Sequence, residues 1–354
     1  MKHRMVLALI GAGFLALAGV AQGQMYPSAP GRDVDSFSPS KKTRPSEATG
    51  VEKNGVYDET EVKHSWFSFT KPSEKTPEAQ FERAEKLRQA GLFKSAGKAY
   101  FALVITWPRS AQAAISQQRY AEMLAVRGLN EDAFDEYDKL IDKYVGSFDY
   151  TSIIEEQFKL AQKVMNRRKG KFLLFGGWKA PERAIPMFES ILKHAPRWDG
   201  AAEAQYMIGV ANEMIDEMDL AIVAYMNTQH RYPESPFAEK SGFGRAHCLY
   251  VMSEESPNDE ETMEQAYAAV VAFLNTYPKS DHVEVATAYR DTLLRKRAEI
   301  AYNRAVFYDK VAKQPKAALM TYENFVRMFP NSEWTETARG RIEQLRPLAE
   351  KAKK

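Results

Sequence analysis

Apolar residues recur at spacings of three and four along the chain from Pro77 onward, and glycine and proline stand almost only between these apolar stretches. This spacing is the period of an amphipathic helix, and Gly and Pro are typical of helix ends. Runs that would indicate a strand are missing from the pattern. The sequence therefore predicts an all-helical fold for this part of the chain.

One pattern recurs six times in the helical part. An alanine is followed four residues later by an aromatic or apolar residue, seven later by another, and twelve later by proline. The first copy consists of Ala96, Tyr100, Leu103 and Pro108. The second has Val145 where proline is expected, and the fourth has Thr228 at the seventh position. The other five copies begin at Ala133, Ala184, Ala221, Ala266 and Ala318.

The recurring pattern has a simple physical meaning. A small alanine lets the second helix of a hairpin approach the first, the aromatic residue fills the gap to the next hairpin, and proline ends the helix. Ala84 and Gly209 fit the matching contact in the preceding helices. Two of the intervals between successive alanines of the pattern lie near the tetratricopeptide period of about 34 residues. The longer intervals imply extended hairpins or insertions. We therefore expect a tetratricopeptide-type solenoid that winds as a right-handed superhelix.

Composition divides the chain into a signal peptide (1–23), a disordered tether (24–76), N-terminal helical repeats (77–235) and C-terminal helical repeats (236–354). The N-terminal repeats carry an insertion at 165–180 between the two helices of the third hairpin. A final helix, from Glu333 to about Lys351, would cap the last hairpin.

The first residues have the layout of a secretory signal. Basic residues at 2–4 precede an apolar run from Met5 to Val20, and Ala21 and Gly23 stand where a signal peptidase reads small residues. Cleavage is thus expected before Gln24. An uncleaved membrane anchor is the alternative.

The tether is rich in Pro, Ser, Gly and Lys and shows no helical period, which is typical of a flexible segment. One aromatic island, His64 to Phe69, interrupts it. This island either packs on the first helix as a cap or docks onto a partner.

The insertion combines four basic residues at 167–171 with Phe175, Trp178 and further apolar residues. Basic residues beside aromatic ones suit a bilayer surface or an acidic partner. The alternative is a loop folded against the solenoid with its aromatic residues buried. We include Phe175 and Trp178 among the candidate contact residues.

Charge and reactive residues argue against catalysis. With 49 basic and 47 acidic residues the net charge is only +2, so no nucleic-acid partner is indicated. The single cysteine, Cys248, cannot form an intramolecular disulfide and is expected to be buried. No metal-ligand spacing or phosphate-binding loop occurs, and the histidines that follow the expected cleavage site are dispersed: His64, His194, His230, His247 and His282. We therefore expect no enzyme activity, no cofactor and no small-molecule substrate.

The segment from residue 269 to 346 is more specific than the repeat class. Its features are a repeat that ends in Phe273, Tyr277, Pro278 and Ser280, a long helix over about 281–313 with Leu294, Ala298 and Tyr302, and a hairpin closed by Phe329, Pro330, Asn331 and Ser332. In these features the segment resembles the family of BamD, the outer-membrane protein assembly factor. The rest of the chain resembles secreted tetratricopeptide proteins in general.

The resemblance implies a periplasmic protein at the outer membrane. BamD-like proteins bind the barrel insertase BamA through their C-terminal repeats and are thought to handle unfolded barrel precursors near the N-terminal ones. One departure is that BamD is a lipoprotein, whereas no cysteine follows the expected cleavage site here. Membrane association would need another route, such as the tether or the aromatic island, or the protein is a soluble relative.

Candidate protein-binding residues lie on the helices expected to line the superhelical groove, which are the first helices of the hairpins. For the N-terminal half they are Arg83, Lys86, Gln117, Tyr120, Gln157 and Lys159. For the C-terminal half they are Arg290, Arg295, Arg297 and Arg304 on the long helix, where the resemblance implies contact with BamA. The competing interpretation of each is an ordinary solvated surface.

Three functions remain open from the sequence. The first is a non-catalytic scaffold of the outer-membrane assembly machinery, with a BamA-type insertase and unfolded barrel precursors as partners and a peripheral contact with the membrane. The second is a tetratricopeptide adaptor that coordinates peptidoglycan or cell-division proteins. The third is an envelope protein that only oligomerises.

Overall fold

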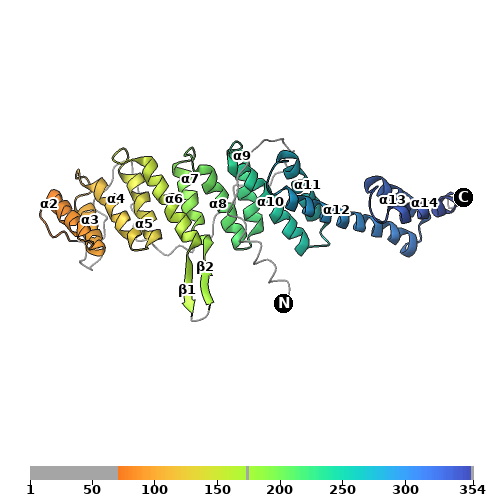
Figure 1. The fold of residues 1–354 in the computed structure, drawn as a ribbon, viewed down its shortest axis with the longest axis horizontal. Helices are drawn as coiled ribbons and strands as arrows, with labels where there is room; N and C mark the ends of the chain where they lie inside the picture. The colour runs from red at the N-terminus through yellow and green to blue at the C-terminus, as the bar shows by residue number, and fades with distance from the viewer. Residues whose placement is uncertain (1–70, 173–174, 352–354) are drawn as a thin grey trace, which may run out of the picture. The chain divides into compact units, whose positions relative to one another are not determined.

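The computed structural model describes residues 71–172 and 175–351, with the backbone alone for residues 168–179. The predicted signal peptide, the aromatic island and nearly all of the predicted tether lie outside the described residues. Within them the chain forms helices joined by short turns, together with one small two-stranded sheet (Figure 1). The all-helical, hairpin-based fold is therefore confirmed, apart from that sheet.

The chain divides into two compact units that adjoin in sequence between Ile153 and Ile154. In the smaller unit each helix packs on the next one along the chain. Its helices are α2 (Pro77–Gln89), α3 (Phe93–Thr106), α4 (Ala113–Val126) and α5 (Asn130–Lys143).

The larger unit continues the same principle, with successive helices from α7 to α14 packed in chain order. Its main helices are α6 (Tyr150–Asn166), α7 (Ile185–His194), α8 (Ala201–Met214), α9 (Met218–Arg231), α10 (Pro236–Glu255), α11 (Glu260–Thr276), α12 (Val283–Val306), α13 (Pro315–Met328) and α14 (Thr335–Lys351). A π-helical turn, η4 (Phe307–Val311), extends α12. The long helix and the capping helix predicted from the sequence are thus both present.

The recurring sequence pattern marks the core of each hairpin. All six alanines are completely buried, and the residues four and seven positions later are at most 2% exposed. This includes Thr228, whose hydroxyl donates to the carbonyl of Ala224, so that its polar atom is satisfied inside the core. Because these three positions are buried in every hairpin, the pattern remains detectable although the hairpins differ in length.

The end of each second helix has a common geometry. Each helix stops two residues before the proline position, and the cap residue between them has φ from −132° to −123° and ψ from 40° to 63°. A residue before proline is disfavoured in the helical region. Tyr144 adopts the same conformation before Val145, so the packing of the hairpin also holds this turn.

The insertion forms a β-hairpin and not a loop. Strand β1 (Arg168–Phe172) pairs antiparallel with β2 (Phe175–Lys179), Arg168 lies opposite Lys179 and Phe172 lies opposite Phe175. Figure 1 shows it extending away from the neighbouring helices. Basic residues and glycines occupy most of the strands in place of a β-branched run, which is why the sequence does not predict them. Pairing with each other satisfies the backbone groups along the facing edges of the two strands.

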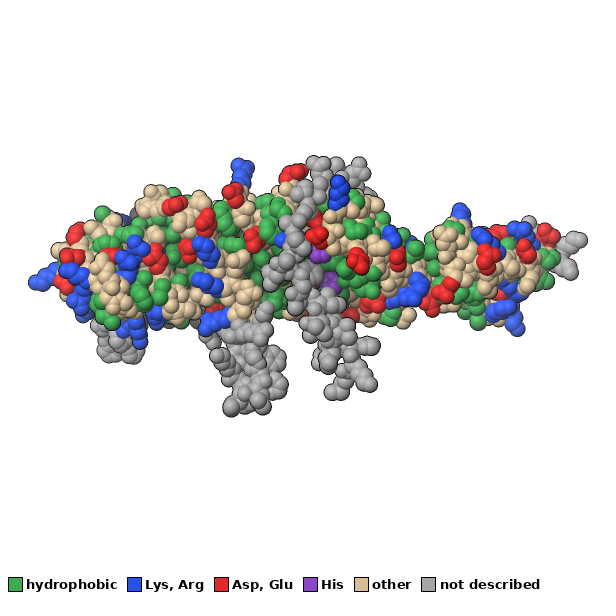
Figure 2. All heavy atoms as spheres, in the orientation of Figure 1, with side chains coloured by type: hydrophobic (Ala, Val, Ile, Leu, Met, Phe, Trp, Pro, Cys, Tyr) green, Lys and Arg blue, Asp and Glu red, His purple; other side chains and the backbone are tan. Residues whose placement is uncertain are grey.

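Among the described helices, none combines the length and the apolar character needed to cross a bilayer. Acidic and basic side chains are interspersed on the visible face of the larger unit (Figure 2). That face therefore presents no extended patch of one charge.

Candidate protein-binding groove

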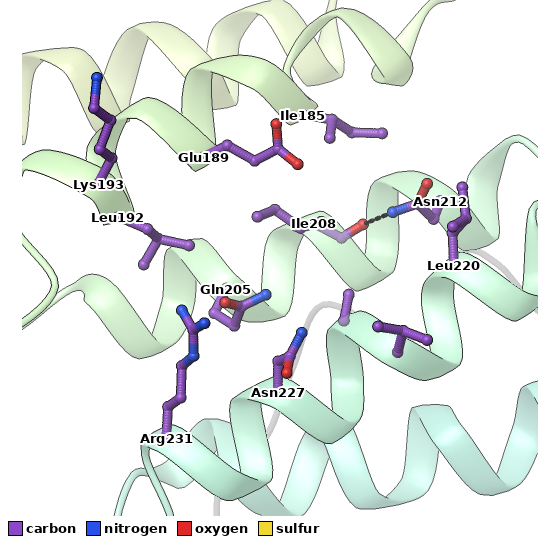
Figure 3. A pocket seen from close by; sticks show the side chains of 12 residues that line it. Ile185, Glu189, Leu192, Lys193, Gln205, Ile208, Asn212, Leu220, Asn227 and Arg231 are labelled. Atoms are coloured by element: carbon purple, nitrogen blue, oxygen red, sulfur yellow. Dashed lines mark hydrogen bonds between the residues drawn. The ribbon is translucent and has the colours of Figure 1, made fainter. Parts of the chain in front are cut away.

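A groove of about 470 Å³ lies in the larger unit between α7 and α9, with α8 as its floor (Figure 3). Second helices of consecutive hairpins form its walls. Its lining residues are Ile185, Glu189, Leu192 and Lys193 of α7, Gln205, Ile208 and Asn212 of α8, and Leu220, Val223, Ala224, Asn227 and Arg231 of α9.

Helix α9 is apolar on two faces. Ala221, Tyr225 and Thr228 form the buried repeat stripe. Leu220 and Val223 lie beside that stripe and line the groove, where they are 50% and 55% exposed. Because these aliphatic side chains are half exposed to solvent, the groove offers apolar surface that a ligand can bury.

Amide side chains lie along the floor and one wall of the groove. Asn212 uses its Nδ2 to donate to the Ile208 carbonyl at 2.8 Å, which fixes its orientation. Gln205 is nearly buried in the floor, and Asn227 projects from α9 towards it (Figure 3). Amides both donate and accept hydrogen bonds, so this strip matches the polarity of a peptide backbone.

The charged residues of the groove are not spread evenly. Lys193 and Arg231 stand near the C-terminal ends of the two wall helices, at the same end of the groove (Figure 3). Glu189 lies on the α7 wall, and burial raises the pKa of its carboxyl group. The end marked by Lys193 and Arg231 is thus the basic end.

Three residues predicted to bind a partner in the N-terminal half are exposed, and each pairs with an acidic residue nearby. These pairs are Arg83 with Glu74 at 3.6 Å, Lys86 with Glu82 at 2.7 Å and Lys159 with Glu156 at 2.7 Å. Such exposed pairs contribute little to stability and can exchange for a ligand.

Two predicted residues are buried, and this placement corrects their assignment to an accessible surface. Gln117 donates through Nε2 to the backbone carbonyl of Glu136 at 3.1 Å and to its Oε2 at 2.6 Å, so it holds α4 against α5. Gln157 has no exposed surface. Tyr120 is half-buried, and its ring packs 4.9 Å from that of Phe101. Helical spacing alone did not reveal which face of each first helix is covered.

Two of the four predicted arginines of α12 hold that helix against α11. Arg297 pairs with Glu264 at 2.7 Å and lies over the ring of Tyr267 at 4.2 Å. Arg304 makes two short contacts with Glu260, at 2.6 and 2.7 Å.

The other two arginines are placed differently. Arg290 pairs with the adjacent Asp291 at 2.8 Å, and Arg295 is exposed. In contrast to Arg297 and Arg304, the ion pair printed for Arg290 lies within α12 and does not join this helix to α11.

The remaining predicted residues, Phe175 and Trp178, lie in β2 opposite Phe172 and Lys169. The hairpin places both on one strand. Their role in contacts stays a prediction.

His247 and Cys248 belong to the interior of the larger unit. His247 Nδ1 lies 2.9 Å from the Tyr289 hydroxyl and its Nε2 lies 3.7 Å from Oε1 of Glu213. Burial lowers the pKa of His247 and raises that of the Cys248 thiol, so both groups are held neutral. Cys248 is buried, as predicted. No group of acidic, His and Cys side chains among the described residues could hold a metal ion.

None of the residues predicted from the sequence lines the groove. From the sequence we expected the binding surface on the first helices of the hairpins, whereas the walls of this groove are second helices. A usable signal was present in α9, because Leu220 and Val223 are apolar residues outside the repeat stripe of that helix. Such residues mark a second apolar face.

Several solved structures of tetratricopeptide repeat proteins are similar to the chain at low levels. One from Parabacteroides merdae is 13% identical, with 76% of this chain and 98% of that chain covered and a TM-score of 0.29. YrrB, described as having an unusual peptide-binding site, is 12% identical over 59% of this chain and 90% of its own, with a TM-score of 0.30. A protein of Thermus thermophilus is 16% identical over 62% and 100%, with a TM-score of 0.26.

No curated protein gives a significant match to the chain. Residues 199–352 match the family model of YfiO, described as an outer membrane lipoprotein. The match begins just before α8 and includes the segment on which the resemblance to BamD rests. Over residues 199–352 the chain therefore matches the YfiO family, in agreement with the resemblance to BamD that its sequence shows.

Proposed function

We propose that the protein is a non-catalytic, protein-binding scaffold that works in the periplasm at the outer membrane. The match of residues 199–352 to the YfiO family is the observation that carries this proposal, because that family is described as an outer membrane lipoprotein. Stacked helical hairpins support it further, since such arrays present long surfaces that suit protein partners.

The partner that fits best is a BamA-type insertase bound by the C-terminal repeats, with unfolded barrel precursors as clients. The resemblance to BamD supports this choice. On α12, Arg290, whose ion pair lies within its own helix, and the exposed Arg295 are the basic residues proposed for such a contact, while Arg297 and Arg304 pair with α11. Basic residues at the rim of an interface act mainly through charge complementarity.

Crosslinking in intact cells, followed by affinity recovery of the tagged full chain and mass spectrometry, tests this proposal. We expect a BamA-type insertase among the recovered proteins. We expect less of it with the double variant Arg290→Glu and Arg295→Glu, because reversed charges repel an acidic partner surface.

A matched control reverses two exposed lysines of α3, in the variant Lys94→Glu and Lys98→Glu, and should leave the recovery unchanged. Recovery of wall-synthesis or cell-division proteins instead of an insertase would overturn the assembly role in favour of an envelope adaptor. Equal recovery with both double variants would remove Arg290 and Arg295 from the contact.

The β-hairpin is a second proposed contact, with the membrane or an acidic partner. Residues 167–180 include five basic and no acidic residues, whereas the whole chain is nearly neutral. The double variant Phe175→Asp and Trp178→Ala should lower the amount of protein that sediments with membranes. Unchanged sedimentation and unchanged partner recovery would rule out this contact.

A further inference from the structure

We propose that the groove between α7 and α9 binds an extended segment of another protein in which aliphatic side chains are followed by acidic ones. This inference rests on the proposed role as a protein-binding scaffold. It does not depend on which protein the C-terminal domain contacts.

The apolar part of the groove selects aliphatic side chains. Leu220 of α9 lies across the Ile208 floor from Ile185 of α7, and Val223 and Leu192 also line the groove. This lining is free of aromatic residues, so it provides a surface of branched carbons without a stacking platform. Burying the half-exposed Leu220 and Val223 under a partner's aliphatic residues removes apolar surface from water.

The amide strip indicates that the bound segment is extended. Within a helix the backbone N–H and C=O groups are already paired with each other. An extended segment leaves them available, and Gln205 and Asn227 can then bond to them from the floor and the wall. The amides therefore complement a strand-like backbone better than a helix.

The charged residues set the direction of the segment. Lys193 and Arg231 stand on opposite walls near the same end of the groove, so the positive charge at that end favours a carboxylate there over a cation. The acidic side chains of the bound segment consequently lie at this end and the aliphatic ones towards Ile185 and Leu220. Glu189, farther along the α7 wall, disfavours a second carboxylate in the middle of the groove.

Fluorescence anisotropy with three labelled peptides tests this inference on the full chain. Each peptide is acetylated and amidated, and carries three leucines alternating with serines, followed by two aspartates, two asparagines or two lysines. We expect the aspartate peptide to bind about tenfold more tightly than the lysine peptide, with the asparagine peptide in between. In the variant Lys193→Glu and Arg231→Glu this order should reverse.

A reversal of preference cannot come from misfolding, because a misfolded groove would bind neither peptide well. The matched pair Val223→Asn and Met226→Asn tests the apolar wall. Met226 is 46% exposed on the same helix but lies outside the groove, so only Val223→Asn should weaken binding, by about fivefold.

Three results would overturn the inference: no binding of any peptide, equal affinity for all three, or equal effects of the two asparagine variants. A concentration-dependent rise in mass that Val223→Asn abolishes would also overturn it, by assigning the groove to a second copy of the chain. Loss of insertase recovery in cells with an intact peptide preference would contradict the proposed partner and leave this groove in place.

Discussion

Tyr225 lies between two glycines and so holds three helices at a short distance. A Cβ on Gly209 of α8 would lie 2.4 Å from Cε1 of its ring, and one on Gly244 of α10 would lie 2.7 Å from Cε2. The phenol donates to Oε2 of Glu213 at 2.6 Å. Because the ring is buried and its hydroxyl is bonded, it has little freedom to move away from an added methyl group.

We therefore expect Gly209→Ala to destabilise the larger unit by about 1–3 kcal/mol through overpacking, despite the better helix propensity of alanine. Thermal unfolding of the full chain, followed by circular dichroism, should show a lower midpoint. Gly340→Ala is the control, since nothing lies within 4 Å of a Cβ built there in α14. That variant should be neutral or more stable by up to about 1 kcal/mol.

A Gly209→Ala variant as stable as Gly340→Ala would show that the ring can shift. The spacing of the repeat pattern predicts a close contact at Gly209, and the structure confirms it. The same spacing does not predict the close contact at Gly244. That glycine lies against Tyr225 from the next hairpin, and none of the positions of the pattern corresponds to it.

The junction of η4 with α14 depends on one buried ion pair. The Asp309 side chain is only 3% exposed, and Arg341 donates to it through Nε and Nη2, both at 2.7 Å. The hydrogen bond and charge of Arg341 hold the pKa of Asp309 below its usual range. The exposed pair of Arg304 and Glu260 joins α12 to α11 with similar distances but without burial.

These two pairs should differ strongly in their contribution to stability. Arg341→Leu leaves a buried carboxylate with the exposed Lys310 3.5 Å away and the Tyr322 side chain beside it, neither of which replaces the two hydrogen bonds of Arg341, and we expect a loss of about 3 kcal/mol. Arg304→Ala should cost less than about 1 kcal/mol, because water screens the pair and can solvate Glu260. Denaturant unfolding of both variants measures the difference, and similar losses would contradict the role of burial.

At the scale of elements, the sequence predicts helices well because their buried stripes repeat. The two strands of the insertion escape prediction because their pairing is local and involves mainly basic residues and glycine. The groove could not be predicted from the sequence for a different reason. Its walls come from helices more than twenty residues apart in sequence, and only their packing on α8 brings Leu192 and Val223 to the same groove.

The buried residues of the described chain form several separate clusters that follow one another along the sequence. One cluster joins α10, α11 and the first half of α12, and the next joins the second half of α12 to α13 and α14. In such an array each hairpin is stabilised chiefly by its neighbours, so its parts can open separately.

Hydrogen exchange should therefore proceed in blocks. We expect residues 312–351, which form the last hairpin of the described residues, to exchange faster than α10 and α11, which pack on α9 and α12, and Arg341→Leu to speed exchange in that block alone. Mass spectrometry of peptic fragments of the full chain measures this. Uniform protection from 199 to 351, or a uniform increase in the variant, would show that the domain opens as one unit.

Helix α12 belongs to both clusters, but not through the same face. Ala286 and Leu293 are seven residues apart and enter the first cluster, and Ala298 and Ala305, again seven apart, enter the second. The step from Leu293 to Ala298 is five residues, which at about 100° per residue turns the buried seam by about 140° around the helix axis. The number of residues between Leu293 and Ala298 therefore sets the direction around α12 in which the last hairpin packs. Insertion of one residue between them would rotate the second buried seam by about a further 100°.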